Sequence, residues 1–118
     1  MTSSAPSSVV FERLSVAGEW DVLAAPELRE RLRTLLDTGR PVVVDLSEAT
    51  FVDSSCLGVF VAAFKASGHQ PLLFFVPRDA SSTVRRVFEV TGLVRALPLV
   101  SSWQEIEQRL ASESHLER

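Results

Sequence analysis

Two short apolar runs limit the folds that are open to this chain. Residues 42–46 and 72–76 are apolar almost without interruption, which is typical of strands buried on both faces of a parallel sheet. Strands are also expected at residues 9–14 and 15–20, between which the apolar residues change faces, and at residues 95–100. The centre of the molecule is therefore predicted to be a sheet covered on both sides.

The segments between these strands carry apolar residues at helical spacing, with capping residues at their ends. We expect helices from Pro26 to a stop at Gly39, from a cap at Asp53 to about Ala66, from a cap at Ser81 or Ser82 to Gly92, and from a capping box at Ser102 to about residue 111. Residues 47–52 are expected to form a loop. Pro98 confines the last strand to a sheet edge, because proline has no backbone N–H to donate.

Strands that alternate with helices in the order β-β-α-β-α-β-α-β-α predict an α/β fold. We expect a mixed, largely parallel β-sheet of about five strands packed with about four α-helices. A length of 118 residues suits one compact domain. The domain is predicted over residues 9–111, between a polar N-terminal tail at residues 1–8 and a frayed C-terminal tail at residues 112–118.

The composition argues against several classes of protein. The net charge is −3 and no cluster of lysine and arginine stands out, so neither nucleic acid nor an anionic membrane is an expected partner. The apolar runs are too short to span a bilayer, and residues 1–8 lack the features of a signal peptide. A single cysteine excludes an internal disulfide. A cytoplasmic location is the expectation.

Catalysis is not expected. His69 falls in a loop and His115 near the C-terminus, and neither stands near Cys56 or Ser55 in the sequence with a carboxylate to orient it. The sequence has no glycine-rich phosphate loop and no metal-ligand spacing. We expect no enzyme activity, no cofactor and no metal.

The segment Asp53-Ser54-Ser55 supports two interpretations. Aspartate and serine before an apolar helical run are typical N-cap residues, because their oxygens accept the first free backbone N–H groups. A helix N-terminus also stabilises a phosphate placed there. Two hydroxyls at a strand-to-helix turn are therefore a plausible phosphoacceptor site. Taken alone, however, the hexapeptide Asp53-Ser54-Ser55-Cys56-Leu57-Gly58 favours simple capping.

Three aspartates follow or end predicted strands. Asp21, Asp45 and Asp53 are expected on one edge of the sheet, because the carboxyl ends of parallel strands meet there. Each could be only a cap or turn residue. Beside an acceptor serine, carboxylates could hold a kinase's metal ion or donor phosphate, and they would repel a phosphate once it was attached.

The start of the second predicted helix raises two further questions. Cys56 at a helix N-terminus could have a lowered pKa and be reactive, but a lone cysteine is more often a small buried residue, and we favour that interpretation. The helix is apolar nearly all round between Leu57 and Phe64. Either it is sandwiched in the core, or part of its surface is exposed for a partner.

These residues resemble the STAS domain (sulfate transporter and anti-sigma factor antagonist), and within it the stand-alone bacterial anti-sigma factor antagonists. The resemblance extends from about Val9 to Leu110. It rests on four segments in the family's order: Gly18-Glu19-Trp20-Asp21 with Ala25-Pro26-Glu27-Leu28, Val42-Val43-Val44-Asp45-Leu46-Ser47, Phe51-Val52-Asp53-Ser54-Ser55 with Leu57-Gly58, and Val84-Arg85-Arg86-Val87-Phe88 with Thr91-Gly92-Leu93.

The resemblance implies a STAS-like sheet and a phospho-regulated binding protein. Ser55 corresponds to the family's phosphoacceptor. The implied partners are an anti-sigma factor that is also a serine kinase, which binds the unphosphorylated antagonist and so releases a sigma factor, and a metal-dependent serine phosphatase that restores binding. The protein is expected to be a monomer when free. The residues expected to flank the site and contact the partner are Asp21, Asp53, Ser54, Cys56, Leu57 and Gly58.

One residue departs from the family's pattern. The family usually has glycine after the acceptor, where this chain has Cys56. If that glycine lets a kinase approach the backbone, Cys56 could weaken phosphorylation and leave docking intact. This departure motivates an alternative, a non-switching STAS adaptor in a larger signalling or lipid-transport assembly. A third hypothesis is a small-ligand or nucleotide sensor that uses the acidic edge of the sheet.

Overall fold

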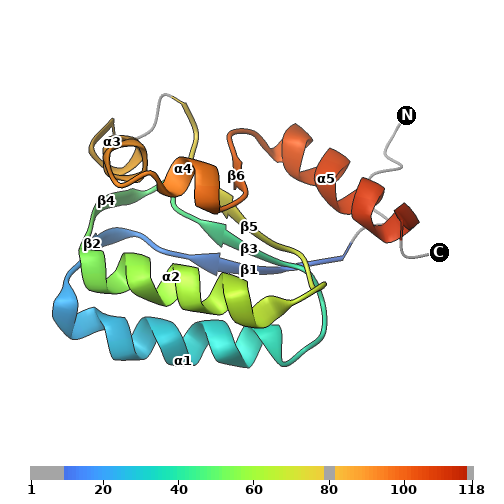
Figure 1. Ribbon diagram of the computed structural model, residues 1–118, viewed down its shortest axis with the longest axis horizontal. Helices are drawn as coiled ribbons and strands as arrows, with labels where there is room; N and C mark the ends of the chain where they lie inside the picture. The colour runs from blue at the N-terminus through green and yellow to red at the C-terminus, as the bar shows by residue number, and fades with distance from the viewer. Residues whose placement is uncertain (1–9, 79–81, 117–118) are drawn as a thin grey trace.

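The computed structural model describes residues 10–78 and 82–116, and their strands form two parallel sheets (Figure 1). The larger sheet has the order β1-β3-β5-β6, and the smaller sheet pairs β2 with β4. The strands are β1 (Glu12–Ser15), β2 (Gly18–Trp20), β3 (Val42–Asp45), β4 (Ala49–Val52), β5 (Leu72–Phe75) and β6 (Leu99–Val100). The α/β class and the largely parallel sheet expected from the sequence are confirmed.

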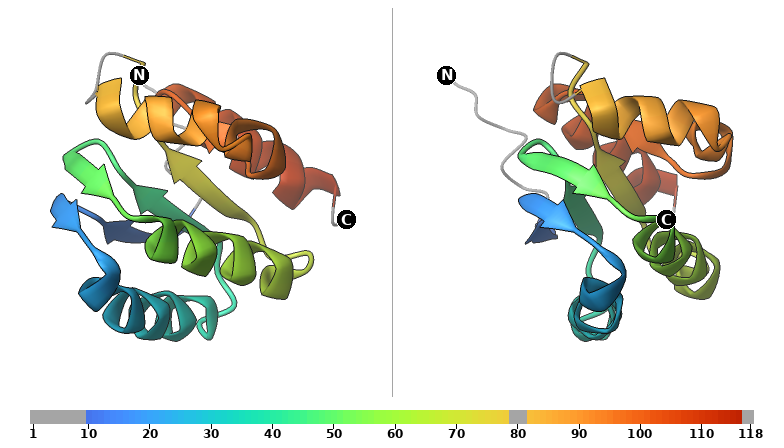
Figure 2. Two further views of the ribbon diagram at one scale, coloured as in Figure 1. Left: turned by 60° about the vertical axis from the view of Figure 1, so that its left-hand side comes forward. Right: turned by 90° about the vertical axis from the view of Figure 1, so that its left-hand side faces the viewer.

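Helices cover both faces of the larger sheet. Within residues 10–78 and 82–116 they are the short 3-10 helix η2 (Val22–Ala24) and the α-helices α1 (Ala25–Leu36), α2 (Ser54–Ser67), α3 (Ser82–Val90), α4 (Leu93–Ala96) and α5 (Trp103–Leu116). Helices α1 and α2 lie side by side against one face, and α5 lies against the other (Figures 1 and 2).

Alternating side chains of the central strands build two cores. On β3, Val42 and Val44 belong to the cluster beneath α1 and α2, while Val43 belongs to the cluster beneath α5. Because the two faces alternate along a strand, a strand covered on both sides must be apolar at nearly every position. This is why residues 42–46 form a continuous apolar run.

Residues 47–52, expected to form a loop, contain strand β4, which pairs with β2. Ala49 and Val52 are buried, but Thr50 and Phe51 between them are exposed, so no alternation appears in the sequence. The strand forms because Trp20 of β2 lies opposite Val52. Such pairing between distant segments leaves no local signal.

The segment expected as a strand at residues 95–100 begins instead with helix α4 (Leu93–Ala96). Gly92 precedes it with a φ of 80°, a left-handed conformation that glycine adopts without strain. Only Leu99 and Val100 pair with β5, and β6 forms the sheet edge that Pro98 predicts.

The last helix is longer than expected. α5 continues to Leu116, past residue 112 where the frayed tail was predicted to begin. At its start the Glu105 N–H donates to the Ser102 hydroxyl over 3.0 Å, as in a capping box, but the Glu105 carboxylate accepts from the N–H of Ser101 rather than of Ser102. The predicted tail at residues 1–8 and the cap at Ser81 lie outside the described residues.

Candidate functional site

Asp53 follows β4 and caps α2. Its backbone is extended, with φ −74° and ψ 159°, and its carboxylate accepts from the N–H of Ser55 over 2.9 Å. Its carbonyl accepts from the N–H groups of Cys56 and Leu57. The predicted N-cap is therefore present, and it uses one of the free N–H groups at the positive end of the helix.

The start of α2 is joined to the end of β2. The Asp53 N–H donates to the carbonyl oxygen of Trp20 over 2.9 Å. The carboxylate of Asp21 caps η2 by accepting from the N–H of Leu23 over 3.0 Å. Asp21 and Asp53 thus cap two neighbouring helical segments, η2 and α2. These are two of the three aspartates that were expected on one edge of the sheet.

Ser54, Ser55 and Gly58 reach the surface of α2. Ser54 and Gly58 are exposed and Ser55 is half-buried. The Ser55 hydroxyl has no hydrogen-bond partner among the described residues. A Cβ atom added to Gly58 would meet nothing within 4 Å, so the backbone there is open to close approach. These three residues form the accessible part of the predicted site.

Cys56 and Leu57 point the other way. Cys56 is completely buried and Leu57 is 5% exposed, and both belong to the core beneath α1 and α2. The Cys56 thiol donates to the carbonyl oxygens of Trp20 at 3.6 Å and Asp21 at 3.5 Å. These two residues anchor the site rather than lining its surface.

The environment of Cys56 disfavours the thiolate. Burial raises the pKa of the Cys56 thiol, and the nearby carboxylates of Asp53 and Asp21 raise it further. These effects oppose the lowering that a helix N-terminus can produce. This supports the interpretation of Cys56 as a small buried residue.

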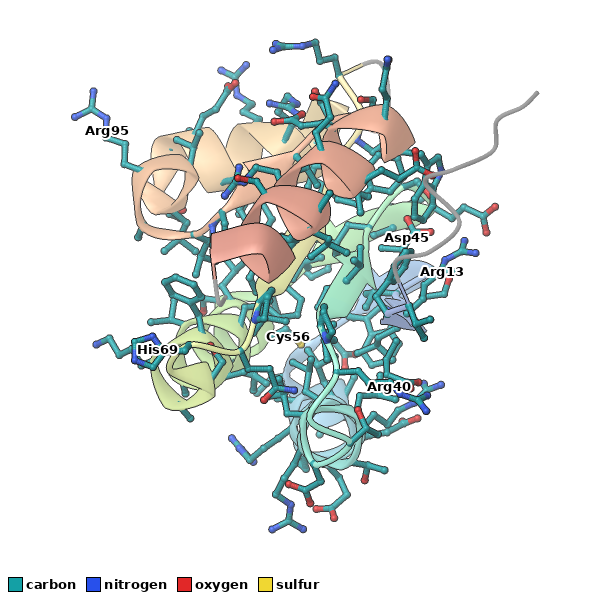
Figure 3. The ribbon with its side chains drawn as sticks, turned by 90° about the vertical axis from the view of Figure 1, so that its right-hand side faces the viewer. Arg13, Arg40, Asp45, Cys56, His69 and Arg95 are labelled. Atoms are coloured by element: carbon teal, nitrogen blue, oxygen red, sulfur yellow. The ribbon has the colours of Figure 1, made fainter. Side chains whose placement is uncertain are left out.

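Asp45 does not join the other two aspartates. Asp45 lies two residues after Val43 on β3, so its side chain is on the same face of the sheet, the face covered by α5. Cys56 packs on the opposite face (Figure 3). The Asp45 carboxylate is 2% exposed and accepts from the Arg13 guanidinium at 2.6 Å and the Ser47 N–H at 2.9 Å. The acidic cluster expected at the site therefore consists of Asp21 and Asp53.

The surroundings of Asp45 keep it ionised. Burial alone would raise the pKa of Asp45, but hydrogen bonds from Ser47 and the charge of Arg13 outweigh it and hold the pKa below its usual value. Arg13 also lies over the Trp103 ring, 5.2 Å from its centroid. Asp45 therefore helps to attach α5 to the sheet.

Exposed apolar side chains lie on the two elements next to the start of α2. Val22 and Leu23 of η2 are 56% and 85% exposed, and Phe51 of β4 is 41% exposed. η2 packs against α2, and β4 leads directly into it. The adjacent Val22 and Leu23 in the short segment before Pro26 were the available signal in the sequence for this surface.

The described part of the structure offers no group of side chains suited to a metal ion. His69 follows α2, at the opposite end of the helix from Ser55 (Figure 3). Residues 10–78 and 82–116 contain no group of three histidine, cysteine or acidic side chains that could hold a metal ion. None of the described helices is both long enough and apolar enough to cross a membrane.

Comparison with known proteins identifies the class to which this fold and site belong. A family model described as "Mlab, STAS domain" matches residues 6–101, so the chain belongs to the STAS domain family. It is 35% identical over 98 residues to the anti-sigma-B factor antagonist of Staphylococcus aureus (strain NCTC 8325 / PS 47), and the alignment covers 82% of this chain and 89% of the relative.

Solved structures agree with this assignment. The crystal structure of an anti-sigma factor antagonist from Mycobacterium paratuberculosis is 26% identical and superposes with a TM-score of 0.72, covering 84% of each chain. The Bacillus cell fate determinant SpoIIAA in its phosphorylated form has the same fold, with 20% identity and a TM-score of 0.56, covering 81% of this chain and 87% of SpoIIAA.

Proposed function

We propose that this chain is an anti-sigma factor antagonist that is switched by phosphorylation on Ser55. The unphosphorylated form binds an anti-sigma factor with serine kinase activity and so releases a sigma factor. The observation that carries the proposal is the half-buried Ser55 at the capped N-terminus of α2, with its hydroxyl unengaged by the described residues. The relationship to the Staphylococcus aureus antagonist supports it.

The surface around Ser55 suits a protein partner. Leu23 and Val22 of η2 present exposed apolar side chains, and Gly58 leaves the backbone of the neighbouring helix α2 bare. Exposed apolar groups rimmed by polar residues are typical of protein interfaces. We assign this surface, which also includes Phe51, to docking of the anti-sigma factor.

A phosphate on Ser55 would oppose that docking. It adds nearly two negative charges beside Asp21 and Asp53, and it has to be desolvated when a partner covers it. A helix N-terminus stabilises an anion by about 0.3–1 kcal/mol, but the Asp53 carboxylate already accepts from the Ser55 N–H. The charge of the phosphate is therefore poorly compensated within the chain and would have to be desolvated at the interface.

The buried position of Cys56 favours switching over the adaptor alternative. A kinase that approaches from solvent meets the same backbone as with glycine, because the thiol points toward Trp20 in the interior. The departure from the family's pattern therefore gives no reason to expect impaired phosphorylation. A metal-dependent serine phosphatase would remove the phosphate, and the free protein would be a cytoplasmic monomer.

The test is to incubate the purified chain with candidate anti-sigma factor kinases and MgATP, and to read the intact mass and map any phosphate. Ser55→Ala is compared with Ser54→Ala, which removes the neighbouring, more exposed hydroxyl. We expect one phosphate, lost in Ser55→Ala only, and loss of kinase binding once it is attached.

Other outcomes separate the alternatives. Phosphorylation of Ser55→Ala to the wild-type extent would refute the site. Binding without phosphorylation, unaffected by Ser55→Asp, would favour the adaptor. A thermal shift with a nucleotide in the absence of any kinase binding would favour the sensor.

A further inference from the structure

A shallow apolar groove of about 210 Å³ lies between α1 and α2. Its floor is formed by the buried side chains of Leu32 and Val59, which are 1% and 4% exposed. Its sides include the exposed Ala62 and Ala66 of α2. Small-molecule sites are usually larger, about 300–1,000 Å³. The groove suits one large apolar side chain of a protein partner.

Two arginines of α1 line the same groove. Arg33 is paired with Glu30, which raises the pKa of Arg33. Arg29 makes no ion pair with any residue in the described part of the chain, although the chain as a whole is negatively charged. An apolar floor beside an unpaired guanidinium is complementary to a segment that presents an apolar side chain next to a carboxylate.

The groove continues the surface that contains Ser55. α1 and α2 run side by side in the same direction, so Arg29 lies on the part of α1 nearer the N-terminus of α2 (Figures 1 and 2). Val59 is about 6 Å and Ala62 about 10 Å along the helix axis from Ser55, at about 1.5 Å per residue. These spacings are close to the Debye length of about 8 Å at physiological salt.

We propose that this groove receives an acidic amphipathic helix of the anti-sigma factor, with an apolar side chain between the helices and a carboxylate on Arg29. The proposal rests on the proposed function and specifies the partner's chemistry. It also extends the switch, because a phosphate on Ser55 would repel the carboxylates that such a helix carries toward Arg29. The same face of α2 would then bind the partner helix and carry the phosphate that repels it.

The test uses two substitutions that change the groove and two matched controls. Arg29→Glu reverses the unpaired charge, and Ala62→Trp fills the groove from an exposed position. Arg95→Glu and Ala96→Trp make the same changes at exposed positions of α4. The affinity of each unphosphorylated protein for the anti-sigma factor kinase is measured by calorimetry at about 50 mM and about 300 mM salt. Charges on the protein surface are screened weakly at the lower concentration and strongly at the higher one.

We expect both groove variants to bind at least about tenfold more weakly, with unchanged unfolding curves, and both controls to bind as wild type. At the Arg29 contact, Arg29→Glu should also reverse the salt dependence of binding, because added salt weakens the repulsion between the new carboxylate and the partner's carboxylate. If the wild type binds and phosphorylation of Ser55 abolishes binding, but the groove variants bind normally, this inference is wrong and the proposed function stands. If no anti-sigma factor kinase binds the wild type, both are wrong.

Discussion

The thiol of Cys56 lies 3.6 Å from the carbonyl oxygen of Trp20, where the end of β2 meets the start of α2. The same carbonyl accepts from the N–H of Asp53, so one backbone oxygen joins the strand, the helix cap and the first helical turn. The residue that departs from the family's pattern is thus part of the support beneath Ser55 and not of the surface above it.

Cys56 should be unreactive in the native protein. Because burial and the neighbouring carboxylates raise its pKa, the thiolate is scarce at pH 7 and becomes abundant only at a pH above that of an ordinary cysteine. A chromogenic disulfide reagent should label the native protein slowly at pH 7–8 and rapidly once urea unfolds it. Stoichiometric labelling of the folded protein within the time needed for a free thiol would contradict this prediction.

Removing the cap at Asp53 should destabilise the protein. Asp53→Ala leaves the Ser55 N–H without its acceptor at 2.9 Å, and loss of an N-cap side chain costs about 1 kcal/mol. Asp53→Asn should retain most of the stability, because its amide oxygen can accept the same hydrogen bond. The free energy of unfolding in urea distinguishes them, and equal stability of the alanine variant and wild type would argue against the cap.

Asp45→Asn should lower the free energy of unfolding at neutral pH by about 2 kcal/mol. The substitution replaces the buried carboxylate by a neutral amide, so the charged hydrogen bond with Arg13 is lost. This loss of stability is smaller than for a fully buried ion pair because the Arg13 side chain is 54% exposed. Asp37→Asn, at the exposed end of α1, is the control and should change stability little.

The effect of Asp45→Asn should depend on pH in one direction. The native state lowers the pKa of Asp45, so its contribution is present above the unfolded-state pKa and is lost as the pH falls through the lower native pKa. The difference between wild type and variant should be constant from about pH 5 to 8 and should shrink in acid. Unfolding in urea at several pH values measures it, and a difference that grows in acid would reverse our assignment.

Leu23→Ser should weaken binding of the anti-sigma factor without affecting folding. Leu23 is 85% exposed, so the substitution should change the free energy of unfolding by less than about 0.5 kcal/mol. If Leu23 belongs to the docking surface, affinity should fall about tenfold or more. Val10→Ser, at a 60% exposed position before β1, is the matched control, and an equal effect of both substitutions would count against the surface.

Several features could be predicted from local patterns. The two apolar strands at residues 42–45 and 72–75, the cap at Asp53 and the edge position of the strand after Pro98 could each be predicted in this way. They follow from the conformations and hydrogen bonds that these residues allow over a few neighbouring positions. The order of such elements was enough to predict a parallel sheet between helices.

The tertiary structure decided the rest. Strand β4 exists because residues 49–52 pair with β2, and Asp45 was separated from Asp21 and Asp53 because its register on β3 turns it toward Arg13 and α5. The inward direction of Cys56, the exposure of Leu23 and the groove beside Arg29 likewise depend on what packs against each residue. The sequence by itself determined the two buried strands, the main helices and the cap at Asp53, because those depend on near neighbours. Which faces were covered and which remained accessible depended on contacts between segments far apart in the chain.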